Sequence, residues 1–133
     1  QILIPDNVYY LKMFSPPNPK EFNKKVWEIV KQIPSGKVTT YGRIAAMIAT
    51  PKGITLKEYE GLGARWVGSA MAGCPEEGPW QRVINAQGKV SVRKNNEGHL
   101  IQKKLLEAEG IEFDAKDRID LARYEWNPTQ PTL

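Results

Sequence analysis

Nucleophilic or acid–base chemistry in this chain would depend on very few residues. The 133-residue sequence has one cysteine, Cys74, and one histidine, His99. A histidine between a loop and a predicted helix is typical of the surface, although it would suit a general base. Cys74 continues the inward face of a predicted helix. This position favours a buried small thiol over a reactive thiolate, which needs an exposed, electropositive setting.

The sequence also lacks the residues that metal, disulfide and nucleotide-binding sites require. One cysteine and one histidine argue against a structural zinc site, and a single cysteine excludes an internal disulfide. The sequence contains no phosphate-binding loop and no dinucleotide-binding glycine pattern. We therefore expect no metal and no cofactor. No stretch of the sequence approaches the length of a membrane span, so we expect no membrane partner.

The charge of the chain points to an anionic partner. The formal net charge is +4 and the sequence pI is about 9.2. Such a balance favours a polyanion, and nucleic acid is the common one. The length suits one domain with a single modest core. We expect residues 1–18 to form an N-terminal arm, because Ser15 to Pro19 break regular structure, and residues 19–133 to form the domain.

Two helices are predicted at the start of the domain. The first begins after an Asn18 cap and presents an apolar stripe before Pro34–Gly36 end it. The second begins after a Thr40 cap and extends from Tyr41 to about Ala49. The stripe of the first helix consists of Phe22, Val26, Ile29, Val30 and Ile33.

A third helix, predicted from about Ala64 to Met71, has two different faces. The inward face carries Val67, Ala70, Met71 and Cys74 at helical spacing, and the outward face carries Arg65, Gly68, Ser69 and Ala72. Small residues allow a helix to approach another surface closely. That surface is either DNA, with Arg65 at phosphates or base edges, or another helix of the same protein.

The C-terminal half is predicted to contain a hairpin and a last helix. Strand-like runs at 83–84 and 89–92 flank the turn signal at 85–88. The helix is predicted from about His99 to Glu109, with Ile101, Leu105 and Ala108 inward and Gly110 as its stop. The fold class is therefore mainly α with a small β hairpin, and the second and third helices resemble a helix-turn-helix.

Residues 78–85, Gly-Pro-Trp-Gln-Arg-Val-Ile-Asn, resemble a segment of the O6-alkylguanine-DNA alkyltransferases. That family carries Pro-Cys-His-Arg-Val there, whereas this chain has Trp80 and Gln81. The chain is therefore similar to the alkyltransferase-like branch, which has tryptophan in place of the reactive cysteine. The resemblance extends from about Phe22 to Gly110. It includes residues 38–45, 64–71 and 105–110, and the ending 124–128 is similar to tails of the branch.

The resemblance implies a pocket without transfer chemistry. Alkyl transfer needs an activated nucleophile, and Trp80 has a ring N–H donor but no sulfur. Gln81 stands where the family has its relay histidine and cannot titrate, while Glu109 matches the carboxylate at the far end of that relay. Trp80 offers a wide apolar surface to an alkyl group or its guanine. The implied lesion pocket consists of Met71, Trp80, Gln81, Arg82, Val90 and Ser91.

The resemblance also assigns roles in DNA binding. It implies a winged helix-turn-helix-like domain, of the type found C-terminally in the family, whose recognition helix enters the minor groove. Arg65 then fills the base stack that the flipped nucleotide leaves, while Gly68, Ser69 and Ala72 permit close approach. Tyr41 crowds the phosphate and promotes rotation of the nucleotide; the alternative is an aromatic residue that covers the core at a helix start.

Two segments depart from the family pattern. The link at residues 51–63 is longer than usual and includes residues 54–59, which are predicted to form a short turn of their own. The departure leaves the geometry of the helix-turn-helix open, though not the Arg65 face. The loop at residues 90–98, which walls the lesion pocket in the family, is slightly longer and more basic.

These observations predict a monomeric protein, not an enzyme, that binds duplex DNA containing O6-alkylguanine. The resemblance implies that it shields the lesion or marks it for nucleotide excision repair proteins. It would act in the cytoplasm at the nucleoid of a prokaryote, or in the nucleus of a eukaryote. Two alternatives remain: an active alkyltransferase that uses Cys74, and a winged-helix transcription regulator that never flips a base.

The basic balance and the Arg93–Lys94 loop predict a strong dependence of DNA binding on salt. Lysine and arginine contacts with phosphates release counterions, so affinity for undamaged duplex should fall steeply between about 50 and 200 mM salt. Titration of one labelled duplex at several salt concentrations measures this slope. A flat response would contradict a DNA-binding surface.

Overall fold

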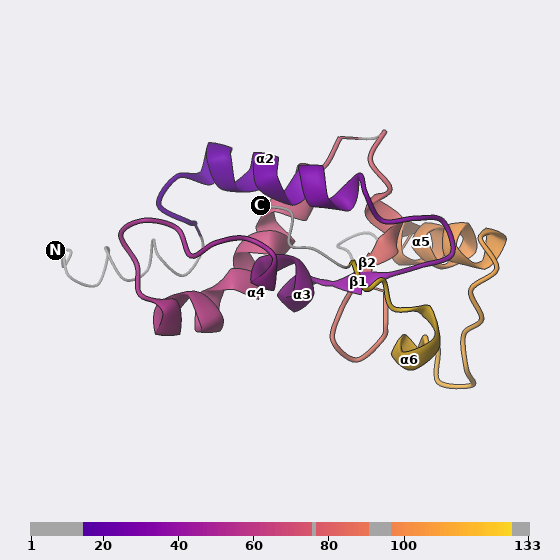
Figure 1. The fold of residues 1–133 in the computed structure, drawn as a ribbon. Helices are drawn as coiled ribbons and strands as arrows, with labels where there is room; N and C mark the ends of the chain where they lie inside the picture. Colours follow the sequence, from indigo (N-terminus) through magenta and orange to yellow (C-terminus); the bar gives the residue numbers. More distant parts are fainter. Residues whose placement is uncertain (1–14, 76, 91–96, 129–133) are drawn as a thin grey trace, which may run out of the picture.

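The computed structural model describes residues 15–75, 77–90 and 97–128. Their elements, in order, are α2 (Pro19–Val30), β1 (Thr39–Thr40), α3 (Tyr41–Ala46), α4 (Leu56–Ala72), η1 (Trp80–Arg82), β2 (Val83–Ile84), α5 (Glu97–Ala108) and α6 (Leu121–Tyr124). Helices α2, α3 and α4 lie on one side of the short strands, and α5 and α6 lie on the other (Figure 1). The predicted mainly helical fold class is confirmed.

The first core cluster lies between α2, α3 and α4. Helix α2 begins as predicted, because the Asn18 side chain accepts from the Glu21 N–H at 3.2 Å and Pro19 follows the cap. Its stripe is buried, and Val26, Ile29 and Val30 are fully inaccessible to solvent. Of the predicted arm, residues 1–14 lie outside the described residues, and Pro16 is buried beside the start of α2.

The helix that carries Arg65 is longer than the sequence pattern predicts. Helix α4 begins at Leu56, two turns before Ala64, so most of the 51–63 link is helical. Thr55 and Glu58 form a capping box there, with hydrogen bonds of 3.1 and 2.9 Å. Gly63 hides the helical signal because glycine lowers helix propensity, yet a Cβ there would lie 2.9 Å from Ala45 Cβ. Glycine therefore permits the close packing of α4 on α3.

Helix α3 is shorter than predicted. It ends at Ala46 rather than near Ala49. Two i→i−3 hydrogen bonds follow, from Met47 N to Ile44 O and from Ile48 N to Ala45 O, and they tighten the chain into a turn. Thr40 caps the helix as predicted, since its hydroxyl accepts from the Arg43 N–H at 3.2 Å.

The predicted hairpin is replaced by a parallel pair. Val83 and Ile84 pair with Thr39 and Thr40, so β2 adds to β1 rather than to the segment that follows it. The turn at 85–88 does form, because Gly88 N donates to Asn85 O at 3.0 Å. After it, Lys89 and Val90 are not in a strand, and Gly88 O instead accepts from Ile119 N at 2.8 Å. Residues 91 and 92 of the predicted hairpin lie outside the described residues.

The prediction for the inward face of the last helix is wrong. In α5 the buried side chains are Gln102 and Leu106, at 1% and 0% exposure, whereas Ile101 and Leu105 are 50% and 39% exposed and Ala108 is also exposed. The helix turns a polar residue inward because the Gln102 amide satisfies two backbone carbonyls of the 80–84 segment. Leu106 joins the second core cluster: Val38, Ile84, Val90, Leu106, Ile111, Ile119 and Tyr124.

The C-terminal tail returns to the middle of the fold. Val38 N donates to Tyr124 O at 3.0 Å, and Trp126 N donates to Val38 O at 2.7 Å, which forms a parallel bridge next to β1. Trp126 packs against the first cluster, while Tyr124 belongs to the second. The tail therefore contributes to both clusters.

Gly88 and Gly110 both adopt left-handed backbone conformations, but only Gly88 lies close to other atoms. Alanine substitutions at the two positions therefore distinguish backbone strain from steric clash. Gly88 has φ +81° and its added Cβ would meet Ile119 O at 2.6 Å, whereas Gly110 has φ +93° and open space around it. We expect Gly110→Ala to cost about 1 kcal/mol, from backbone strain alone. Gly88→Ala should cost about 2–4 kcal/mol, because a backbone clash is added. Denaturant unfolding measures both, and equal losses would contradict the predicted close approach of Gly88 to Ile119.

Candidate nucleic-acid interface

The outward face of α4 is available for contact with another molecule. Arg65, Ser69 and Ala72 are exposed and Gly68 is half-buried, with nothing within 4 Å of a Cβ added at Gly68. The alternative that these small residues serve internal helix packing is therefore wrong. Gly63, which the sequence analysis did not single out, has that role instead.

The opposite face of α4 holds the helix in place. Trp66 and Val67 are fully buried, and Ala70 and Met71 are nearly so, as the inward face predicts for three of them. Trp27 Nε1 donates to Ala70 O at 2.9 Å, and Tyr59 Oη donates to Ala45 O at 2.7 Å. These contacts with α2 and α3 present the Arg65 face on a rigid support.

Tyr41 opens α3 at the edge of the first core cluster. Its ring packs against that cluster and remains partly accessible. Two residues later, Arg43 lies close to the C-terminal tail, with Nη2 donating to Asn127 Oδ1 at 2.8 Å and Nε 3.2 Å from Glu125 Oε2. The sequence analysis missed this contact, because nothing in the pattern relates residues 84 positions apart.

Trp80 begins the short 3-10 helix η1 immediately after Pro79. Its backbone N–H donates to Gly78 O at 2.8 Å, which makes the turn tight. The indole is half-buried and packs against the first cluster, which also contains Met71. Two of the six predicted pocket residues are therefore associated with the same cluster.

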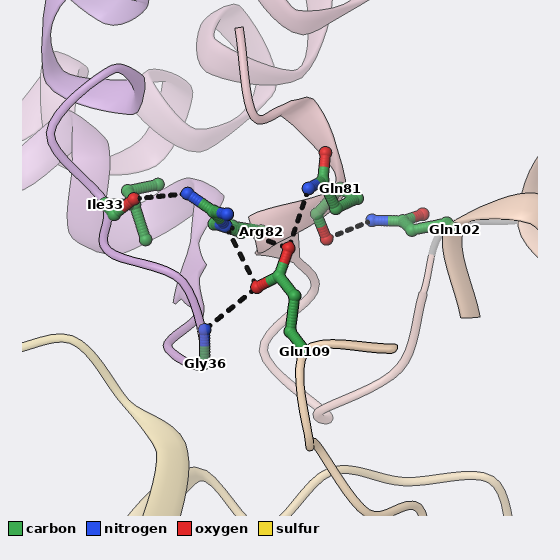
Figure 2. Close-up of polar contacts among 6 residues, drawn as sticks. All are labelled: Ile33, Gly36, Gln81, Arg82, Gln102 and Glu109. Atoms are coloured by element: carbon green, nitrogen blue, oxygen red, sulfur yellow. Dashed lines mark hydrogen bonds and ion pairs between the residues drawn. The ribbon is translucent and has the colours of Figure 1, made fainter. Parts of the chain in front are cut away.

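Gln81 and Arg82, the next two residues of η1, both contact Glu109 (Figure 2). Gln81 Nε2 donates to Glu109 Oε2 at 2.8 Å, and Arg82 Nε lies 3.0 and 3.1 Å from the two carboxylate oxygens. Gly36 N adds a third donor at 2.9 Å. The structure thus brings together Gln81, Arg82 and Glu109, the residues that the resemblance assigns to the relay and its neighbour.

Arg82 is occupied by contacts within the protein. Besides Glu109, its Nη1 donates to Ile33 O at 2.8 Å, beyond the end of α2. Val90 is 9% exposed and belongs to the second cluster, with Ile84 and Leu106. Ser91, the remaining predicted pocket residue, lies outside the described residues.

The hydrogen bonds around Glu109 set its charge state. Burial raises the pKa of this carboxyl, but the donors from Arg82, Gly36 and Gln81 outweigh burial and leave the pKa below its ordinary value of 4.5. Glu109 is therefore ionised at neutral pH. Gln81 can donate to this carboxylate but cannot carry a proton to it from a nucleophile.

Gln102 is a second feature of the site that sequence reasoning missed. Its Nε2 donates to Gln81 O and to Val83 O, both at 3.0 Å. A glutamine on an amphipathic helix is ordinarily predicted to face water. Its inward position depends on the backbone carbonyls of Gln81 and Val83, which need hydrogen-bond donors. The sequence carries no signal for this need, because it arises only when α5 packs beside η1.

Among the residues that the structure describes, no group of three or more His, Cys, Asp or Glu side chains is placed to hold a metal ion. No helix within the described ranges is long and apolar enough to cross a membrane.

Cys74 is half-buried and packs against the first cluster just beyond the end of α4.

The sequence of residues 21–111 matches the family described as "6-O-methylguanine DNA methyltransferase, DNA binding domain". The match covers more than half of the chain, which therefore belongs to this family.

Several relatives are similar over most of the chain. A "DNA base-flipping protein" of Vibrio parahaemolyticus is 42% identical, over 81% of this chain and 98% of the relative. "Alkyltransferase-like protein 1" of Schizosaccharomyces pombe is 40% identical, over 81% of this chain and 96% of the relative.

Solved structures show the same likeness. The Schizosaccharomyces pombe Atl1 structure in complex with damaged DNA containing O6-carboxymethylguanine has a TM-score of 0.66 and 38% identity. It covers 82% of this chain and 97% of the other. Mycobacterium tuberculosis OGT has a TM-score of 0.52 and 29% identity, over 77% of this chain and 53% of the other.

Glu109 predicts a pH-dependent contribution to stability. Glu109→Gln should cost about 2–4 kcal/mol at neutral pH, because it leaves the largely buried Arg82 cation without its counterion. A carboxyl whose pKa is lowered on folding stabilises above its unfolded pKa. The difference between wild type and variant should therefore persist from neutral pH down to about 5 and shrink below 4.5.

Urea unfolding across this pH range measures the difference. The matched control is Glu107→Gln, since Glu107 is an exposed carboxylate two residues earlier, in the last turn of α5; its effect should stay within about 0.5 kcal/mol. A loss at Glu109 that is constant with pH would mean that its charge does not stabilise the fold.

Proposed function

We propose that this protein recognises O6-alkylguanine in duplex DNA by flipping the nucleotide into a pocket at Trp80, without alkyl transfer. The observation that carries the proposal is the contact of Gln81 with Glu109 at 2.8 Å, directly after Trp80. This contact supports the relay positions that the resemblance implies, in which an amide stands in place of the titratable group and an indole in place of the nucleophile.

The DNA-binding step would use the outward face of α4. Arg65 is exposed beside small residues on a helix whose other face is buried, so the face can approach a groove without rearrangement. A guanidinium plane can stack on bases where the flipped nucleotide was. Tyr41 at the start of α3 would press on the phosphate, a role that its partly accessible ring permits.

The lesion-sensing step would use Trp80. Its indole is half-buried at the end of the first cluster, so one part is fixed by packing and another part is accessible. An aromatic face binds an alkylated base by stacking and apolar contact, and the ring N–H can donate a hydrogen bond. No step in this scheme needs a metal or a cofactor.

The names of the relatives support the proposal. One is a base-flipping protein, another is an alkyltransferase-like protein, and a structure similar to this chain contains an O6-alkylguanine in DNA. We further propose that the chain acts as a monomer, shields the lesion and marks it for nucleotide excision repair proteins.

The rival enzyme would use Cys74 as nucleophile. This thiol packs half-buried against the first cluster, six residues before the pocket position, which is a poor setting for a thiolate. Incubation with an oligonucleotide containing O6-benzylguanine, followed by intact-mass measurement, distinguishes the two. We expect an unchanged mass, and the gain of one benzyl group would contradict a binding-only function.

Arg65→Ala should weaken binding to the lesion duplex by about 1–3 kcal/mol, because the vacated base stack loses its support. The fold should survive, since Arg65 is exposed. Arg118→Ala, another exposed arginine, is the control and should bind normally. Equal affinities of wild type and a folded Arg65→Ala variant would remove Arg65 from the interface.

Trp80→Ala should affect recognition of the lesion but not general affinity for DNA. Affinity for undamaged duplex should stay nearly intact, while preference for O6-methylguanine falls about tenfold or more, because one aromatic contact is worth about 1–3 kcal/mol. Thermal unfolding and titrations of both duplexes measure these quantities on the same variant.

The control is Trp126→Ala, because Trp126 packs against the same cluster but lies in the tail. It should lose stability without losing lesion preference. If Trp80→Ala loses affinity for both duplexes in parallel, Trp80 is a core residue rather than the lesion contact.

A further inference from the structure

The backbone that follows Trp80 accepts two hydrogen bonds from one buried side chain, that of Gln102. Gln102 on α5 is 1% exposed, and its Nε2 donates to the carbonyl oxygens of Gln81 and Val83, both at 3.0 Å. Figure 2 shows the contact with Gln81. The two carbonyls flank Arg82, so a single amide spans the end of η1 and the start of β2.

We propose that Gln102 is a positioning residue for the lesion pocket, which it serves by fixing the backbone turn that presents the Trp80 indole. The inference rests on the proposed function of Trp80 and names a residue that touches neither DNA nor the lesion. Two neutral hydrogen bonds from one side chain, to a carbonyl of η1 and to a carbonyl of β2, restrict how η1 can shift when a base enters.

The buried side chain of Gln102 carries a destabilising feature, which supports a role beyond fold stability. Its Oε1 is buried and has no hydrogen-bond partner, and an unpaired buried acceptor destabilises a fold. The neighbouring inward residue of α5, Leu106, is fully buried and purely apolar, which is the ordinary solution for such a face. Position 102 instead carries an amide of which the donor half alone is used.

The other contacts of the segment do not replace Gln102. Glu109 holds the side chains of Gln81 and Arg82, and Ile33 O accepts from the Arg82 guanidinium. Side chains are flexible tethers, whereas the Gln102 bonds act on the backbone itself. Backbone hydrogen bonds from Trp80 N to Gly78 O and from Arg82 N to Pro79 O tighten the turn, and β2 pairs with β1, but none of these contacts ties the Gln81 carbonyl to α5.

Gln102→Met tests the inference, because methionine has a similar volume and cannot donate a hydrogen bond. Affinities for two duplexes, which differ by one O6-methylguanine, are measured with full-length variant and wild type. We expect preference for the lesion to fall about five- to tenfold, while affinity for undamaged duplex is unchanged. In the free protein, the amides of residues 81–84 should exchange with solvent faster than in wild type.

Leu106→Val is the matched structural control, since it removes buried volume from the same face of α5. It should lower stability and leave lesion preference as in wild type. Should Gln102→Met fail to fold, Gln102→Asn retains the amide but is too short to reach both carbonyls, and the same change is expected.

Unchanged preference and unchanged exchange in the folded variant would overturn the inference, and so would an equal loss of preference in Leu106→Val. A wild-type protein without lesion preference would instead contradict the proposed function. The exchange rates, measured without DNA, would then still decide whether Gln102 fixes the turn.

Discussion

The carboxylate of Glu109 is the contact on which the architecture of the site depends. It accepts from Gly36 at the end of the α2 region and from Gln81 and Arg82 of η1, while it sits just beyond α5 itself. Three segments that lie far apart in the sequence therefore meet at one charge. A largely buried ion pair is weak evidence for stability, but it fixes geometry well when every donor is placed. Here it fixes the turn that begins with Trp80, whose indole packs against the cluster that also contains the buried face of α4.

The two core clusters support different parts of the site. The first cluster holds α4 so that Arg65 and the small residues face outward, and the second cluster holds α5 beneath the η1 turn. The first cluster thus supports both the outward face of α4 and the Trp80 indole, whereas α5, held by the second cluster, contacts the backbone of η1 through Gln102. Under the proposed function, Glu109 has a structural and orienting role, because Gln81 beside it cannot titrate.

Much of this arrangement could be predicted from the sequence, but certain elements could not. The faces of α4 followed from helical spacing, and the meeting of Gln81 with Glu109 followed from the resemblance. The two extra turns of α4 were hidden by Gly61 and Gly63, which have low helix propensity; at Gly63 this is offset by close packing on Ala45. The face of α5 was assigned wrongly because apolar periodicity favoured Ile101 and Leu105, whereas the backbone carbonyls of η1 required a donor at Gln102. Long-range polar contacts such as Arg43 with Asn127 leave no periodic signal, and the parallel pairing of Val83 with Thr39 depends on the whole fold.

The most direct test of the account is a pair of equilibrium titrations with the wild-type protein. The two labelled duplexes share one sequence and differ by a single O6-methylguanine, and the salt concentration is the same in both. The account predicts tighter binding to the modified duplex, with the methyl group still on the DNA when the complex is recovered. Equal affinity for the two duplexes, or recovery of unmethylated guanine, would contradict recognition of the lesion without transfer.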